Sequence, residues 1–133
     1  MITAVDTNVL LDVFLPDDRH GPASRRLLRA AYDTGAVVIS DVVYAELAAA
    51  FDDRADLDDA LRRINVSASP LDTEVAFLAG RRWLDYRRAG GPRDRIITDF
   101  LIGAHALMKA DRFLTRDRGF YDTYFQDLRR FEE

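Results

Sequence analysis

The sequence predicts an α/β fold, a three-layer α/β/α sandwich whose helices enclose a central parallel sheet. Short apolar runs rich in β-branched residues, such as 36–39, alternate with stretches whose apolar residues recur at helical spacing, such as 23–32. Parallel strands are joined by helical crossovers, so this alternation is typical of a parallel sheet covered on both faces. We expect the strands near Asp6, Val38 and Phe113 to share that sheet.

Cap residues, prolines and apolar spacing predict where each helix and strand begins and ends. The first strand begins at Ile2 and ends at Asp6, and the helix after it, over 7–14, ends before Pro16. Ser40 is a good N-cap for a helix over 41–51. The rest of the chain predicts helices over 53–63, 72–89 and 94–110, strands over 64–68 and 112–115, a helical turn over 119–125 and an edge strand over 128–131.

Length and composition limit the classes of protein to consider. A chain of 133 residues suits a single domain over 1–133. The absence of Cys excludes disulfides and thiolate metal sites and suits a reducing cytoplasm. The N-terminus shows no signal-peptide pattern, and no apolar run is long enough to cross a membrane. A net charge of −4 argues against binding nucleic acid by charge alone.

Four acids occupy comparable places along this pattern, at or near the ends of strands and in the helices that follow: Asp6, Glu46, Asp99 and Asp117. Open α/β sheets place their chemistry at the carboxyl ends of strands. Taken singly, Asp6 could merely cap a helix and Asp99 could pair with Arg95. Taken together, the acids predict one shared site, and oxygen ligands without Cys favour Mg²⁺ or Mn²⁺.

Three stretches then carry a resemblance to a known family: 5–12 (VDTNVLLD), 40–47 (SDVVYAEL) and the block from 99 (DFLIGAHA) through 114–121 (LTRDRGFY). In order and spacing they resemble the PIN domain, and in particular the VapC-type ribonuclease toxins. The resemblance implies a metal-dependent endoribonuclease that hydrolyses RNA phosphodiester bonds, with Mg²⁺ or Mn²⁺ as cofactor and a small VapB-like antitoxin as partner. It assigns catalysis and metal binding to Asp6, Glu46, Asp99 and Asp117, with Thr7, Asn8 and Thr115 in support.

Arginines interleaved with aromatic residues offer an RNA-binding surface, because Arg contacts phosphates and aromatic rings stack on unpaired bases. The alternative is an ordinary helix with Trp83 in the core and its arginines in solvent. The candidates are Arg81, Arg82, Trp83, Tyr86, Arg87, Arg88, Arg95 and Arg116.

The amphipathic helices over 41–51 and 53–63 form the candidate surface for the antitoxin, with Phe51 and Leu57 as exposed apolar residues. These faces could equally pack on each other or form a homodimer.

Other functions stay open at this point. One is a PIN-type nuclease of RNA processing that has no antitoxin. A phosphoacceptor or phosphatase of similar architecture would need a lysine near the site, and the phosphatase a second Asp where this chain has Asn8; Lys109 is the only lysine. A catalytically silent interaction domain would have no need of the full acidic quartet. His105, among small apolar residues, is more typical of packing than of catalysis.

Overall fold

The computed structural model describes residues 1–15, 18–92 and 96–132, and these contain a four-stranded parallel sheet with the order β3-β2-β1-β4. The parallel sheet and its shared strands confirm the fold class predicted from the sequence. The strands are β1 (Thr3–Val5), β2 (Val37–Ser40), β3 (Val66–Ser69) and β4 (Arg112–Leu114).

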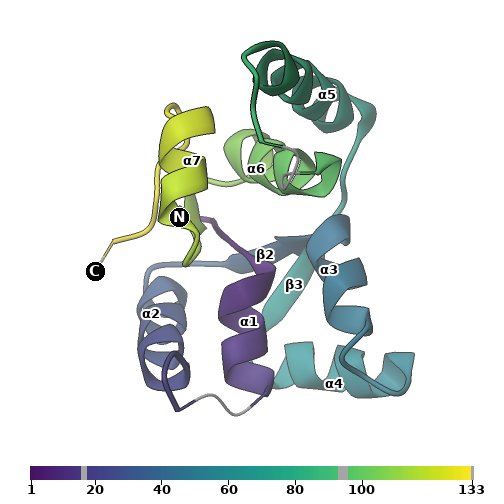
Figure 1. Cartoon of the computed structure of the whole chain (residues 1–133). Coiled ribbons are helices and arrows are strands. Elements are labelled where there is room, and N and C mark those ends of the chain that lie inside the picture. Colours follow the sequence, from purple (N-terminus) through teal and green to yellow (C-terminus); the bar gives the residue numbers. More distant parts are fainter. Residues whose placement is uncertain (16–17, 93–95, 133) are drawn as a thin grey trace.

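Helices cover both faces of this sheet. In Figure 1, α5, α6 and α7 lie above the sheet, whereas α1, α2 and α4 lie below it. The helices are α1 (Thr7–Phe14), α2 (Gly21–Asp33), α3 (Asp41–Ala48), α4 (Arg54–Arg63), α5 (Thr73–Arg88), α6 (Ile97–Lys109) and α7 (Arg118–Tyr124). No helix in the described ranges combines the length and apolar character needed to cross a membrane.

The central strand β1 fixes where the site lies. It pairs on one side with β2, where Thr3 faces Val37, and on the other with β4, where Val5 faces Leu114. The Asp6 backbone N–H extends the second pairing by donating to the Leu114 carbonyl at 2.9 Å. The residues that follow β1 and β4 therefore leave the sheet side by side at its carboxyl edge.

An aromatic cluster anchors α6 and α7 over the sheet. Phe100 contacts Phe120 edge to face at 5.2 Å between ring centroids and lies 6.0 Å from Phe125. Gly103 makes this approach possible, because a Cβ at that position would come within 2.6 Å of the Phe125 ring. The packing holds the first turn of α6, and with it Asp99, in a defined place.

Several element boundaries differ from the predicted ones. β3 begins only at Val66, because Asn65 adopts a left-handed φ of 58°. α3 ends at Ala48, short of the predicted 51. α6 begins at Ile97, and the predicted start at 94 falls outside the described residues. The predicted edge strand over 128–131 is an isolated bridge between Arg130 and Phe113.

Candidate functional site

Asp6 lies at the junction of β1 and α1, where it is the N-cap of the helix. Its carboxylate accepts hydrogen bonds from the Thr7 backbone N–H at 2.8 Å, the Thr115 hydroxyl at 2.7 Å and the Asn8 amide at 3.3 Å. The structure thus brings the three residues predicted to support the site onto Asp6, two from α1 and one from the end of β4.

The Asp6 carboxylate is buried, although it lies at the carboxyl edge of the sheet, and this burial changes its pKa. Its side chain is buried, with 7% exposure, and its three donors are neutral. Burial raises the pKa of Asp6 from 3.8 to about 6; the hydrogen bonds from Thr115 and Thr7 oppose this rise, and the charges of Glu46 and Asp117 add to it. In the described part of the chain, no Arg or Lys forms an ion pair with Asp6.

Glu46 reaches this site from α3. Ser40 caps that helix as predicted, accepting from the Val43 N–H at 3.2 Å. Glu46 is exposed on this helix, whereas Val43 and Leu47 beside it are buried. Its carboxylate accepts a 2.6 Å hydrogen bond from the Thr7 hydroxyl, so Thr7 links Glu46 to the residue that follows β1.

Asp117 follows β4 and stands at the start of α7. Its backbone N–H donates to the Thr115 hydroxyl oxygen at 3.0 Å, while the same hydroxyl donates to Asp6. One buried threonine therefore joins the two acids through a continuous chain of hydrogen bonds. The charges of Glu46 and Asp117 are both close enough to act on Asp6.

Asp99 stands in the first turn of α6, where it is half-buried. Its carboxylate accepts a hydrogen bond from the Ile96 N–H at 3.3 Å, an arrangement that stabilises the start of the helix. Arg95, the alternative partner that the sequence offers for Asp99, lies outside the described residues. A place for Asp99 in a common site with the other three acids stays a prediction.

The acids are not gathered as metal ligands in this structure: within 1–15, 18–92 and 96–132, no three acidic or histidine side chains stand close enough to share an ion. The donor chemistry nevertheless fits a hard divalent cation, because carboxylate oxygens are the ligands that Mg²⁺ and Mn²⁺ prefer. The burial of Asp6 among neutral donors is the observation that supports this fit, since a bound cation would balance the charge of its ionised form.

The candidate RNA-binding residues on α5 divide by burial. Tyr86 is 3% exposed and packs against Phe100 and Tyr124, so its ring cannot stack on a base, contrary to the prediction. Trp83 is half-buried, with the Arg87 guanidinium 5.0 Å above its ring. Arg82 makes a two-point contact with Asp127.

The remaining candidates keep exposed side chains or have partners of their own. The guanidinium of Arg81 lies over the Phe77 ring at 5.1 Å, and Arg88 is exposed. Arg95 falls outside the described residues. The structure leaves these residues as untested candidates for RNA contact.

Arg116 is held by a residue that the sequence did not single out. Its guanidinium donates to both carboxylate oxygens of Asp12, at 2.6 and 3.0 Å, and the Ser24 hydroxyl donates to the same carboxylate at 2.6 Å. Asp12 is 4% exposed. A single acid in an otherwise uncharged helix, as Asp12 is within 7–14, was the available signal for such a pair.

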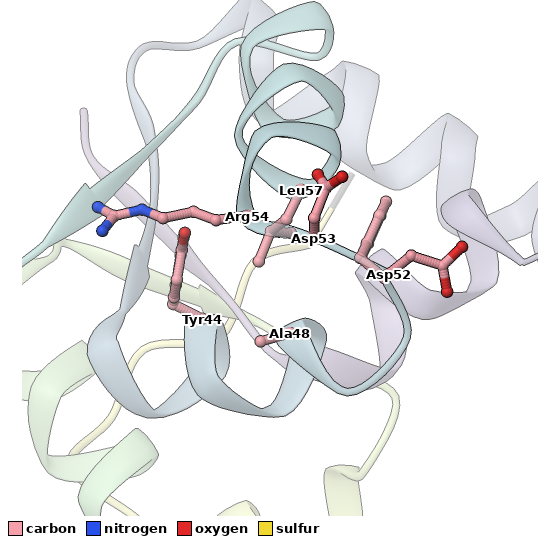
Figure 2. Close-up of a pocket in the computed structure, with 7 residues that line it drawn as sticks. Tyr44, Ala48, Asp52, Asp53, Arg54 and Leu57 are labelled. Carbon is pink, nitrogen blue, oxygen red and sulfur yellow. The ribbon is translucent and has the colours of Figure 1, made fainter.

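The predicted antitoxin surface also looks different in three dimensions. Leu57 is buried, and Phe51 is half-buried, with its ring edge to face against Phe14 at 5.5 Å. Between α3 and α4 the surface instead forms a pocket of about 410 Å³. Figure 2 shows Tyr44 and Ala48 on one side of it and Asp53 and Arg54 on the other.

The sequence was also compared with protein families and with curated proteins. The PIN domain family matches residues 3–126, a range that includes all four acids, Asp6, Glu46, Asp99 and Asp117. Among curated proteins no match was found.

Solved structures provide the comparison of folds. VapBC2 from Rickettsia felis, bound to a DNA fragment from its promoter, aligns with a TM-score of 0.74 and 18% identity over 98% of both chains. VapBC-1 from nontypeable Haemophilus influenzae aligns with a TM-score of 0.71 and 20% identity over 99% of this chain and 98% of that one. VapC20 from Mycobacterium tuberculosis, a toxin that cleaves the sarcin–ricin loop, aligns with a TM-score of 0.60 and 18% identity over 89% and 93%. These likenesses show that the same fold is used.

Proposed function

The chain belongs to the PIN-domain family, and from this membership and the buried Asp6 we propose that it is a metal-dependent endoribonuclease acting in the cytoplasm as one domain. Its substrate is RNA, and its cofactor is Mg²⁺ or Mn²⁺. The observation that carries the proposal is a carboxylate at the carboxyl edge of a parallel sheet, 7% exposed, with two acids nearby and only neutral donors on it.

Asp6, Glu46, Asp99 and Asp117 would hold the ion. When bound, a divalent ion lowers the pKa of a water ligand and offsets charge on the scissile phosphate. Thr115 and the Thr7 backbone hold Asp6 in one orientation and favour its ionised form. The Thr7 hydroxyl orients the Glu46 carboxylate by donating a hydrogen bond to it.

The activity test uses the purified chain with single-stranded and stem-loop RNA. We expect cleavage with Mg²⁺ or Mn²⁺ and none with EDTA. Asp6→Asn, Asp99→Asn and Asp117→Asn should each lower the rate by more than about 100-fold, beyond what an outer partner of a metal ligand costs. Glu46→Gln should do nearly the same. Asp33→Asn, which changes an exposed acid of α2, is the matched control.

Equal cleavage by wild type and Asp6→Asn would mean that the site is misassigned. Metal binding supplies a second readout, because an ion that binds only the folded state raises the free energy of unfolding by about 2.7 kcal/mol at a hundred times its dissociation constant. We expect Mn²⁺ to raise the melting temperature of the wild type and to leave that of Asp6→Asn unchanged.

We further propose that the nuclease is the toxin of a toxin–antitoxin pair. Two structures that share its fold over nearly the whole chain are VapBC complexes. A small VapB-like antitoxin is then its partner, and a homodimer is the competing use of the α3–α4 face. Co-purification of the product of a neighbouring short reading frame tests this; without such a product, the nuclease stands as an RNA-processing enzyme.

A phosphoacceptor domain would need a lysine near Asp6, and Lys109, the only lysine, has another partner. The Lys109 ammonium lies 2.6 Å from the Asp72 carboxylate, at the opposite end of α6 from Asp99. Treatment with acetyl phosphate should therefore leave Asp6 unmodified.

A further inference from the structure

Buried Asp12 and partly exposed Arg116 form an ion pair that lies outside the four acids proposed to hold the ion. Asp12 lies on α1 about one and two-thirds turns beyond Asp6, and both of its carboxylate oxygens accept from the Arg116 guanidinium. Ser24 of α2 donates a further hydrogen bond to this carboxylate at 2.6 Å. The two-point geometry fixes the direction as well as the position of the arginine.

Arg116 is also held through its backbone. Its N–H donates to the Asn8 side-chain oxygen at 3.2 Å, and the Asn8 amide donates in turn to Asp6. Both ends of the residue are therefore bound to α1, the side chain at Asp12 and the main chain at Asn8.

The neighbours of Arg116 in sequence are two residues of the candidate site. Thr115, which precedes it, donates to Asp6, and Asp117, which follows it, donates its N–H to Thr115. No regular element supports this connection, because β4 ends at Leu114 and α7 begins at Arg118. Contacts from Arg116 to Asn8 and Asp12 tie this connection to α1.

We propose that Asp12 and Arg116 are positioning residues, a clamp that holds residues 115–117 against α1 and so places Thr115 and Asp117 beside Asp6. The catalytic meaning of the clamp rests on the proposed nuclease function. The pair acts through the residues on either side of Arg116. Its guanidinium is turned to Asp12, and Asp6 is affected by the charges of Glu46 and Asp117 rather than by an arginine.

The competing role for Arg116 is direct contact with an RNA phosphate, and the two roles differ in what Asp12 does. In a clamp, Asp12 is as important as Arg116, and lysine cannot replace the arginine because an ammonium does not reproduce the two-point contact. In a phosphate contact, lysine retains most of the charge interaction and Asp12 has little effect on substrate affinity.

The first experiment is independent of function and follows amide hydrogen exchange in Asp12→Asn. We expect exchange at the Arg116 and Asp117 amides to become at least about tenfold faster than in the wild type, relative to the amides of β2. Asp122→Asn is the matched control, because it breaks the 2.7 Å ion pair with Arg130 elsewhere in the C-terminal region. Protection lost equally in β2 and at residues 115–117, or kept at both, would overturn the clamp.

The second experiment measures Mn²⁺ affinity and RNA cleavage for Asp12→Asn, Asp12→Glu and Arg116→Lys. For Asp12→Asn and Arg116→Lys we expect Mn²⁺ affinity and kcat to fall about 10–100-fold, the effect typical of residues that orient a metal ligand. KM for RNA should stay within about twofold of the wild type. Asp12→Glu should recover part of the loss.

A rise in KM for Arg116→Lys with normal behaviour of Asp12→Asn would instead make Arg116 an RNA contact. A wild-type chain that neither binds Mn²⁺ nor cleaves RNA would refute the proposed function, and the hydrogen-exchange comparison would still decide whether the clamp exists.

Discussion

Two buried carboxylates on one short helix are treated in opposite ways. Asp12 is 4% exposed and is matched by an arginine and a serine, whereas Asp6, 7% exposed, is matched by neutral donors and faces two further acids. A buried acid with its own arginine is complete within the protein, because charge and hydrogen bonds are both satisfied. A buried acid without one loses the solvation of its charge with no arginine to balance it, and burial accordingly raises the pKa of Asp6.

The largest expected effect comes from removing the charge of Asp12. Asp12→Asn should lower the free energy of unfolding by about 3 kcal/mol, at the low end for a buried pair because the Arg116 side chain is 37% exposed and can reach water. Urea denaturation measures this. Asp122→Asn, whose side chain is 51% exposed, should cost less than about 1 kcal/mol. Equal losses of unfolding free energy in the two variants would contradict the distinction between an ion pair with a buried carboxylate and one with an exposed carboxylate.

Removing the charge of Asp6 should act in the opposite direction. An acid whose pKa is raised on folding stabilises the folded state below its unfolded pKa of 3.8, and this stability is lost as the pH rises through about 6. Asp6→Asn without metal should therefore gain up to about 3 kcal/mol near pH 7.5, and the gain should vanish near pH 4. Denaturation of both proteins across this range in EDTA measures the difference, and a gain independent of pH would contradict it.

A smaller change sharpens the comparison by removing the Thr115 hydroxyl, one of the donors on Asp6. Thr115→Val removes the 2.7 Å hydrogen bond that favours the ionised carboxylate, so the pKa of Asp6 should rise further. The free energy of unfolding should fall by about 1–2 kcal/mol near pH 7.5 and by less near pH 4, where Asp6 is protonated in both proteins. A titration of the Asp6 carboxyl by NMR would measure the pKa directly, and an unchanged value would contradict the role given to Thr115.

The fold was predictable because its signals are local. Helical spacing and β-branched runs set the order of elements, and Ser40 caps α3 as its chemistry suggests. What covers an apolar face is not a local property. Leu57 was predicted to be exposed and is buried, and Tyr86 is buried under a turn in which Gly91 leaves room for its ring.

The residues of the candidate site show the same difference between local signals and long-range contacts. The residues on and around Asp6 could be chosen from motifs, and the structure brings Thr7, Asn8 and Thr115 onto it. The partner of Arg116 lies 104 positions away in the sequence, and no pattern along the chain relates the two. Sequence motifs predict which residues are chemically suited to a role. Contacts between distant parts of the chain, such as Arg116 with Asp12, decide whether the side chain already has a partner.

The pairing of β1 with β4 has a consequence for how the protein is made. Thr115 and Asp6 are 109 positions apart, so the hydrogen bond between them closes nearly the whole chain into one loop. Contacts between such distant segments form late and slowly, because the entropy of loop closure must be overcome first. A chain still emerging during synthesis, with β1 and α1 folded but β4 not yet present, has Asp6 without Thr115 or Asp117. Any activity of this site therefore appears only once synthesis has passed β4.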